Sequence, residues 1–370
     1  MRVLFFKPFL GIGGETRWVF EVGQRLAKRG HEITILFSES LHELLKRIFP
    51  HLTGSINKIK IQAVHLPLGN PIPLNPLRLI RLFNNFDVVY FHHTPPNDFL
   101  ISIIKAKVKV SMIEGLHRFL KSENLLHSVY SQTIMKHTFK TFDGFHVLNN
   151  YVACFLKNQG CKNVYVIPNG VDTKLFSLCK HPANFNSFNV LYTGRLTRNK
   201  GIDILLKIIR YVHEKLSIRD IKFTICGSGQ LEDMVKEVAQ NYENVQYLGF
   251  VPPNSLTSIY REAHVLIIPS RTEGMPLSML EAQSCGLPVV GSKIPGISDV
   301  IINEKTGHLI NVGDIKGFAG AIKKYYELWR ASPEEYHKLN MKIREHILKN
   351  YNWNIIIDRL EEMLRDLSFQ

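Results

Sequence analysis

The sequence lacks any apolar run long enough to cross a membrane. Nowhere among its 370 residues do roughly 18 apolar residues, the length that a spanning helix needs, follow one another. Residues 1–7 are also too few for the apolar region of a signal peptide. We therefore expect a cytoplasmic protein that folds in water.

Cysteine is scarce and scattered. No Cys-x-x-Cys pair occurs, and an odd number of widely spaced cysteines fits neither a disulfide framework nor a zinc site. We interpret the five as packing residues: Cys154, Cys161, Cys179, Cys226 and Cys285. The sequence also has no Asp-x-Asp pair and no His or carboxylate set with metal-ligand spacing, so we expect no metal and no cofactor.

Acidic residues are too few to balance the basic ones, and the shortage lies in the first half. The chain carries a net charge of +14; residues 1–175 hold 22 Lys and Arg against 11 Asp and Glu, a net +11, and residues 176–370 hold the remaining +3. This predicts an acidic partner for the first half, either a membrane surface or a phosphorylated acceptor. We expect no nucleic-acid partner, because no recognition helix, zinc finger or aromatic RNA-binding signature accompanies the charge.

Strand-length apolar runs alternate with helical patterns along the whole chain. This length favours two domains, and the alternation predicts an α/β fold of two doubly wound parallel sheets. The first series of expected strands is 2–6, 32–37, 58–64, 87–91, 108–113, 144–148 and 164–167, and the second is 189–193, 222–226, 245–248, 264–268, 287–290 and 308–310. We expect domains at 1–175 and 176–350, a last helix at 351–370 that crosses back to the first, and a ligand cleft between the sheets.

Two carboxylates eight residues apart follow the expected strand 264–268. Pro276 suits the first position of a helix, whose N–H groups would face an anion, with Glu273 before the helix and Glu281 about one turn inside it. One carboxylate can hold the hydroxyls of a sugar and the other those of a ribose, with a diphosphate between them. The alternative is that Glu281 is an exposed helix residue and that Glu273 only stabilises the helix dipole.

A basic loop, residues 194–201, follows the expected strand 189–193. Arg195 can grip phosphate oxygens with two hydrogen bonds, and Lys200 adds a point charge, which suits a departing diphosphate. The alternative is a solvated basic loop, but the position at the end of a strand favours function.

Glycine-rich turns follow two other strands. Gly13 and Gly14 lie in a turn that does not match the dinucleotide fingerprint, because Thr16 stands at its sixth position. Backbone N–H groups can still approach phosphate there. Gly227 and Gly229 follow the strand 222–226, where a plain tight turn is an equally good interpretation.

Seven motifs together resemble one family. They are Gly13-Gly14, Pro168-Asn169-Gly170-Val171-Asp172, Gly194-Arg195-Leu196 with Lys200-Gly201, Gly227-Ser228-Gly229, Leu248-Gly249-Phe250-Val251, Pro269-Ser270 with Glu273-Gly274-Met275-Pro276 and Glu281-Ala282, and Gly286-Leu287-Pro288-Val289-Val290. Their order and spacing are similar to those of the family 4 retaining glycosyltransferases of GT-B fold (glycosyl transferases group 1), over nearly the whole chain.

The resemblance implies two Rossmann-like domains, the first for an acceptor and the second for a nucleotide diphosphate sugar donor. Arg195 and Lys200 would bind the diphosphate. Glu273 and the backbone of Gly274, Met275, Pro276 and Leu277 would hold the transferred sugar, Glu281 the ribose, Phe250 and Val251 the base, and Gly13 and Gly14 the phosphate from the other domain. The last helix, containing Trp353, would cross back onto the first domain.

One position departs from the family pattern. Such enzymes commonly have a histidine just after the strand equivalent to 108–113, where this sequence has Glu114-Gly115-Leu116-His117. Either Glu114 takes the helper role, or His117 reaches the site from three residues further on. His117 as an ordinary surface histidine is equally compatible with the sequence.

The implied reaction is metal-independent sugar transfer with retention of configuration, in which the acceptor attacks the face from which the diphosphate leaves. A sugar-nucleotide epimerase and a non-catalytic sugar-nucleotide binder of the same fold are the alternatives. Three segments of the first domain interleave apolar and basic residues: 41–49, 77–83 and 99–109. They predict a protein peripheral to the cytoplasmic membrane face, whose acceptor is a lipid-linked or otherwise membrane-held glycan; alternatively, the segments pack on the first sheet with solvated basic faces.

Overall fold

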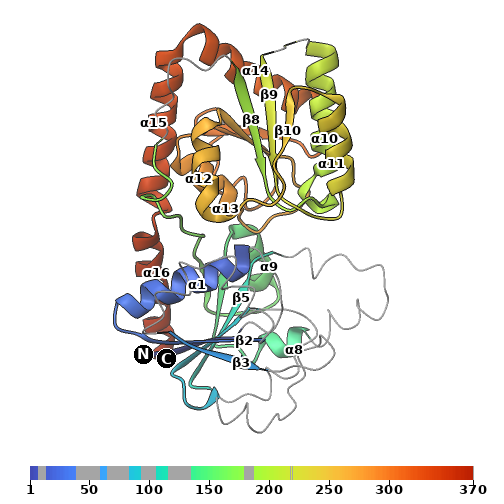
Figure 1. The fold of residues 1–370 in the computed structure, drawn as a ribbon. Helices are drawn as coiled ribbons and strands as arrows, with labels where there is room; N and C mark the ends of the chain where they lie inside the picture. The colour runs from blue at the N-terminus through green and yellow to red at the C-terminus, as the bar shows by residue number, and fades with distance from the viewer. Residues whose placement is uncertain are drawn as a thin grey trace. The chain divides into compact units, whose positions relative to one another are not determined.

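The computed structural model describes residues 1–6, 14–38, 59–64, 83–92, 106–115, 135–178, 187–216, 218 and 220–369. It divides into two compact units (Figure 1). Unit 1 comprises Met1–Pro168 with Asn354–Gln370, and unit 2 comprises Asn169–Trp353. Within the described residues, no helix combines the length and the apolar character that crossing a bilayer requires.

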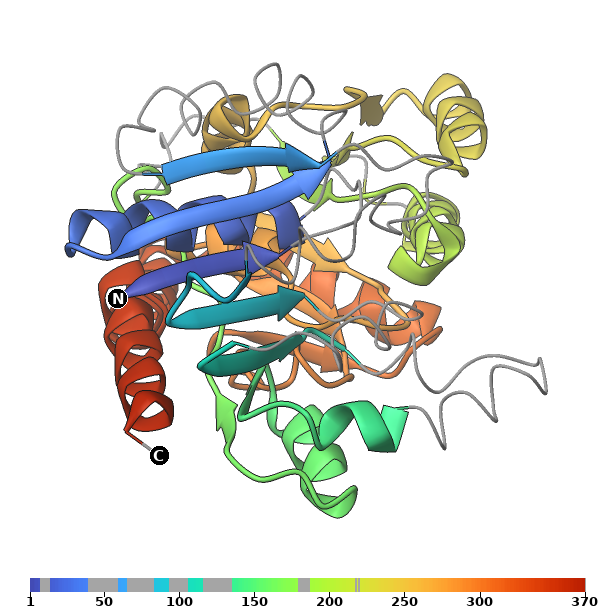
Figure 2. The ribbon, with the colours of Figure 1, turned by 90° about the horizontal axis from the view of Figure 1, so that it is seen from below.

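Unit 1 is built on a parallel sheet of seven strands in the order β3-β2-β1-β4-β5-β6-β7, which lie side by side in Figure 2. The strands are β1 (Arg2–Phe6), β2 (Glu32–Ser38), β3 (Ile59–Val64), β4 (Val88–His92), β5 (Val108–Ile113), β6 (Gly144–Val147) and β7 (Val164–Val166). The described helices are α1 (Gly14–Lys28), α8 (Met135–Phe139), α9 (Asn150–Asn158) and α16 (Trp353–Ser368). Every strand pairs in parallel, so their carboxyl ends share one edge.

Unit 2 repeats this plan with six parallel strands in the order β10-β9-β8-β11-β12-β13. The strands are β8 (Phe188–Thr193), β9 (Ile221–Cys226), β10 (Val245–Tyr247), β11 (Val265–Ile268), β12 (Val289–Ser292) and β13 (Gly307–Ile310). The helices are α10 (Ile202–Tyr211), α11 (Glu232–Asn241), α12 (Pro253–Glu262), α13 (Leu277–Ser284), α14 (Ile315–Ala331) and α15 (Pro333–Asn350). Buried Val, Ile and Phe side chains of β8, β9 and β11 pack with α10 and α14 in one core.

The predicted fold class is confirmed: both sheets are parallel and wound in both directions from a central strand. All thirteen expected strands are present, each with its ends within two residues of the expectation. The pattern succeeds because strands buried on both faces are continuous apolar runs.

The division between the units falls at residue 168, seven residues before the boundary that we expected. Residues 169–172 belong with unit 2 because of what they contact. The side-chain amide of Asn169 donates to the carbonyl of Met275 at 2.8 Å, and Val171 N–H donates to Tyr351 O at 2.9 Å. Gly170 packs so closely on Trp353 that a Cβ would lie 2.4 Å from its ring.

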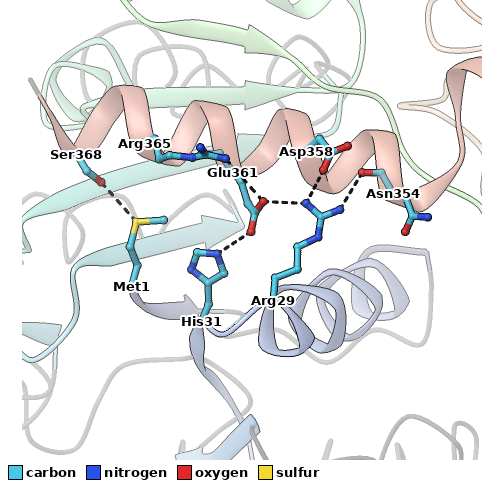
Figure 3. A network of polar contacts seen from close by, with 8 residues as sticks. All are labelled: Met1, Arg29, His31, Asn354, Asp358, Glu361, Arg365 and Ser368. Atoms are coloured by element: carbon cyan, nitrogen blue, oxygen red, sulfur yellow. Dashed lines mark hydrogen bonds and ion pairs between the residues drawn. The ribbon is translucent and has the colours of Figure 1, made fainter.

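The last helix, α16, packs on unit 1 (Figure 3). Arg29, just after α1, donates to Asp358 and to Glu361 Oε2, the latter at 2.8 Å, and His31 Nε2 lies 2.8 Å from Glu361 Oε1. Further along, Leu367 fills the space that a side chain at position 144 would occupy. The helix thus completes the packing of a sheet whose first strand lies more than 350 residues earlier.

A buried histidine on β6 connects β4 to the residue that follows β7. His146, on β6, accepts a hydrogen bond from Tyr90 at Nδ1 and lies 2.7 Å from the carbonyl oxygen of Ile167 through Nε2. Its side chain is fully buried, and this burial lowers its pKa from 6.5 to about 4. The imidazole is therefore neutral at pH 7.

We predict that this histidine makes unit 1 sensitive to acid. Unfolded His146 takes up a proton below pH 6.5, whereas the folded residue resists protonation down to about pH 4, so folding free energy is lost between these values. The stability advantage of the wild type over His146→Gln should shrink by about 3 kcal/mol between pH 7 and pH 4. Urea denaturation at both pH values measures it, and an unchanged difference would contradict the assignment.

Candidate functional site

In the sheet of unit 2, the direction of winding changes between the neighbouring strands β8 and β11. Chain connections run in opposite directions from β8 and from β11, although these strands are neighbours. Parallel α/β sheets bind ligands at such a switch point, outside the carboxyl ends of the strands. The loops that leave here are the lysine loop (residues 194–201), after β8, and the glutamate loop (residues 269–276), after β11.

The two loops meet in a tight ion pair. Lys200 Nζ lies 2.7 Å from both carboxylate oxygens of Glu273. Ser270 donates its hydroxyl to Glu273 Oε1 at 2.8 Å. The Glu273 side chain is only 7% exposed and that of Lys200 is 24% exposed, so the carboxylate has exchanged water for these donors. The structure therefore brings together two site residues that are 73 positions apart.

A glycine allows the loops to approach so closely. Gly201 has φ +72°, and a Cβ there would lie 1.9 Å from the carbonyl oxygen of Pro269. A side chain at this position would both strain the backbone and push the loops apart. Gly201 therefore fixes the turn that begins α10 directly after Lys200.

Arg195 lies on the same loop and is exposed. Its carbonyl oxygen accepts a hydrogen bond from the Tyr192 hydroxyl at 2.9 Å, which holds the loop backbone. Burial raises the pKa of Tyr192, and the charge of Glu273 adds to this rise, so the phenol stays protonated and able to donate. The Arg195 guanidinium forms no salt bridge with any residue that the structure describes.

The loops after β9 and β10 lie beside the lysine loop. Gly227 N–H donates to Gly249 O at 2.7 Å, and a Cβ on Gly227, whose φ is +142°, would lie 1.8 Å from Gly194 O. A Cβ on Gly229 would lie 2.6 Å from Leu196 O. Both glycines are therefore required by close backbone contacts.

Phe250 and Val251 follow Gly249 at this same edge of the sheet. Phe250 is 49% exposed. Val251 is partly buried. Both are thus available at the surface beside the glycine turns.

The glutamate loop runs into α13, which begins at Leu277, with Pro276 at the N-cap rather than at the first helical position that we expected. Asn169 contacts Met275 twice. Its side-chain amide donates to the carbonyl of Met275, and its backbone N–H lies 3.4 Å from the sulfur. Gly274 O contacts Gly296, where a Cβ would lie at 1.9 Å. The backbone of Gly274 and Met275 is therefore contacted by two other chain segments, at Asn169 and at Gly296.

Glu281 lies inside α13 and is 4% exposed. Tyr260, on α12, donates its hydroxyl to Glu281 Oε2 at 2.9 Å. Burial raises the pKa of Tyr260 well above its ordinary value, with the Glu281 charge adding to the rise. The alternative interpretation, that Glu281 is an exposed helix residue, is therefore wrong.

Other predicted site residues lie in unit 1 or outside the described residues. Glu114 lies directly after β5, and Gly14 is the exposed first residue of α1. Gly13 and His117 fall outside the described residues, so the choice between Glu114 and His117 stays open. In the described part of the chain, no group of three or more His, Cys, Asp or Glu side chains is arranged to hold a metal ion.

The sequence did not identify the residues that hydrogen-bond to Glu273, Met275 and Glu281. Ser270 stands in a motif that we quoted, and Asn169 in another, but neither received a role. Their signal is position alone, a short polar residue just after a strand. Tyr260 gave no signal, because its spacing from Glu281 means nothing until α12 and α13 pack together.

Two models of known protein families match most of the chain. A model described as Glycosyltransferase Family 4 matches residues 12–175, and one described as Glycosyl transferases group 1 matches residues 179–346. The two matches meet near the boundary between the units.

Similar proteins agree with this assignment. The chain is 30% identical to an Escherichia coli UDP-Gal:alpha-D-GlcNAc-diphosphoundecaprenol alpha-1,3-galactosyltransferase over 55% of the chain and about half, 54%, of that protein. It is 23% identical to a component of the Arabidopsis thaliana phosphatidylinositol N-acetylglucosaminyltransferase over 98% of the chain and 81% of that protein. Neither supports an epimerase or a non-catalytic binder.

A solved structure shows the fold of the whole chain. The Anabaena protein HepE, in complex with UDP-glucose, superposes with a TM-score of 0.75 at 17% identity, covering 100% of both chains. At that identity, the likeness speaks for the fold alone. The two family matches show that this chain belongs to the family 4 glycosyltransferases (glycosyl transferases group 1), and the two parallel sheets agree with the GT-B fold of that family.

Proposed function

We propose that this protein transfers a sugar from a nucleotide diphosphate sugar to an acceptor, with retention of anomeric configuration and without a metal. The observation that carries the proposal is the Lys200–Glu273 pair at the switch point of unit 2. A cation and a carboxylate side by side suit a donor whose charged diphosphate is joined directly to a sugar rich in hydroxyl groups.

In this scheme, the diphosphate lies between the lysine loop and the start of α13. Arg195 and Lys200 neutralise the charge that grows on the leaving group, and the helix end adds its dipole. Such prearranged charges replace the metal that many phosphate-handling sites use. Family 4 membership and the UDP and UDP-glucose named for the Anabaena structures support this donor class.

The sugar and the nucleoside would lie on either side of the diphosphate. Glu273 accepts hydrogen bonds from the sugar hydroxyls, and the backbone of residues 274–277 forms further hydrogen bonds with them. Glu281 holds the ribose, and the exposed Phe250 with Val251 lies against the base, beside the turns of Gly227 and Gly229. For Gly13 and Gly14 at the phosphate, and for Glu114 or His117 near the sugar, the roles stay predictions from the family resemblance.

We predict that Lys200→Ala and Arg195→Ala each reduce donor turnover at least ~100-fold, because each removes one charge-stabilising group. Release of nucleotide diphosphate from a panel of UDP- and GDP-sugars, with candidate lipid-linked acceptors, measures turnover. The assay contains excess EDTA, which should leave the wild-type rate unchanged. Lys207→Ala, an exposed lysine on α10, is the matched control. Wild-type rates in either site variant, or complete loss of activity with EDTA, would contradict the scheme.

We also predict that Glu281→Gln weakens nucleotide binding more than it slows the chemical step. A neutral amide can still accept the hydrogen bond of Tyr260, but it binds ribose hydroxyls less strongly, by roughly tenfold in dissociation constant. Isothermal titration with UDP and GDP measures the affinity, with the exposed Glu237→Gln on α11 as control. Unchanged affinity would remove the ribose role.

The acceptor that we propose is a lipid-linked glycan, taken from an anionic membrane surface on the cytoplasmic side. The names of the two relatives support it, since one acts on a diphosphoundecaprenol-linked sugar and the other on phosphatidylinositol. The net +11 of residues 1–175 supports it too. The segments 41–49 and 77–82, and residues 99–105 of the third, lie outside the described residues, whereas Phe83 is fully buried.

Co-sedimentation with liposomes tests the membrane proposal. We predict binding to vesicles rich in phosphatidylglycerol, no binding to phosphatidylcholine vesicles, and release at high salt, because screening weakens attraction between exposed charges and acidic lipids. Equal recovery in the supernatant with both lipids would favour a soluble acceptor.

A further inference from the structure

A second ion pair joins the same two loops. Arg271, in the glutamate loop, donates Nη1 to Asp203 Oδ1 and Nη2 to Asp203 Oδ2, each at 2.7 Å. Asp203 lies in the first turn of α10, three residues after Lys200, and Arg271 lies two residues before Glu273. Hydrogen bonding to Arg271 lowers the pKa of the Asp203 carboxyl, so the pair stays charged at neutral pH. We call these two residues the clip.

The clip also holds the backbone around Lys200. The Arg271 guanidinium donates a further hydrogen bond to Arg198 O at 2.6 Å, and the Arg271 N–H donates to Asn199 O at 2.8 Å. The two carbonyls belong to the residues immediately before Lys200. Arg271 therefore contacts the chain on both sides of the lysine, through four hydrogen bonds in total.

The pairing of β8 with β11 ends before these loops begin. The paired residues of β8 and β11 are Val190 with Val265 and Leu191 with Leu266, and both loops extend beyond the strand ends. The Arg271 and Asp203 side chains are 30% and 27% exposed, so the clip is partly buried and water partly screens its charges. A two-bonded Arg–carboxylate pair provides a fixed geometry.

From this arrangement we infer that Arg271 and Asp203 are positioning residues, which hold Lys200 against Glu273 so that the donor meets both charges already in place. The inference rests on the function proposed above. Neither side chain of the clip needs to touch the donor. A displacement of about 1 Å at a reacting centre can cost two orders of magnitude in rate, so a loosened lysine loop should slow transfer without unfolding the protein.

Two variants test the clip, and a third serves as control. Arg271→Lys keeps the charge but cannot form the paired hydrogen bonds, and Asp203→Asn keeps the shape but loses the charge. We expect each to lower kcat at least ~10-fold at saturating donor, with a small change in melting temperature. Arg330→Lys is the matched control, because Arg330 pairs with Asp220 at 3.1 Å elsewhere in unit 2, and it should keep the wild-type rate.

A combination of variants distinguishes positioning from a general structural effect. In a Lys200→Ala background, Arg271→Lys should change kcat less than ~2-fold, because the lysine that it positions is absent. An effect that persists at full size would show that Arg271 acts by another route and would overturn the inference. If both clip variants kept the wild-type rate, the positioning role would be overturned as well, while the donor site would stand as proposed.

Amide hydrogen exchange gives a readout that needs no substrate. In Arg271→Lys, the amides of residues 198–203 should exchange faster than in the wild type and in Arg330→Lys, whereas those of β8 should be unchanged. If the wild type released no nucleotide diphosphate from any UDP- or GDP-sugar, the proposed function would fail, and this exchange pattern alone would decide whether the clip orders the lysine loop. Unchanged exchange at residues 198–203 would then overturn it.

Discussion

The contact between Lys200 and Glu273 depends on the adjacency of β8 and β11. These strands lie about 70 residues apart in the chain, yet they are neighbours in the sheet, because the connections from β8 first run one way to β9 and β10 and then return to the other side. Two loops therefore emerge from adjacent carboxyl ends with no helix between them. Gly201 lets their backbones touch, and Ser270 satisfies one oxygen of the buried carboxylate. Without the switch in strand order, the cation and the carboxylate would belong to different parts of the surface.

Hydrogen-bond donors compensate the buried carboxylates of the site. Each carboxylate of unit 2 that is nearly buried has a named donor: Glu273 has Lys200 and Ser270, and Glu281 has Tyr260. Burial keeps Tyr192 and Tyr260 protonated, so they act as donors and not as competing charges. A ligand that displaces these partners must offer hydrogen bonds of equal quality, because an unpaired buried charge is expensive. Such a site favours a ligand that has both an anion and several hydroxyl groups.

The sequence predicted the fold closely, and the site only in part. Apolar runs located each strand in the part of the chain that the structure describes, because parallel strands buried on both faces leave a clear pattern. Strand position and residue type were sufficient to select Lys200 and Glu273. They could not reveal Tyr260 beneath Glu281 or Arg271 on Asp203, because these contacts arise from packing between helices and loops that no local pattern encodes. The same limit applies to the boundary at residue 168, which depends on Asn169 reaching Met275, 106 residues away.

We propose that the lysine loop and the glutamate loop together form the donor site. A crystal structure of the protein with the nucleotide diphosphate sugar that the donor screen selects would test this proposal. We expect diphosphate oxygens within hydrogen-bonding distance of Lys200 Nζ and the Arg195 guanidinium, and a sugar hydroxyl on the carboxylate of Glu273. A donor bound elsewhere, with Lys200 and Glu273 still paired only with each other and the diphosphate held by other residues, would contradict it.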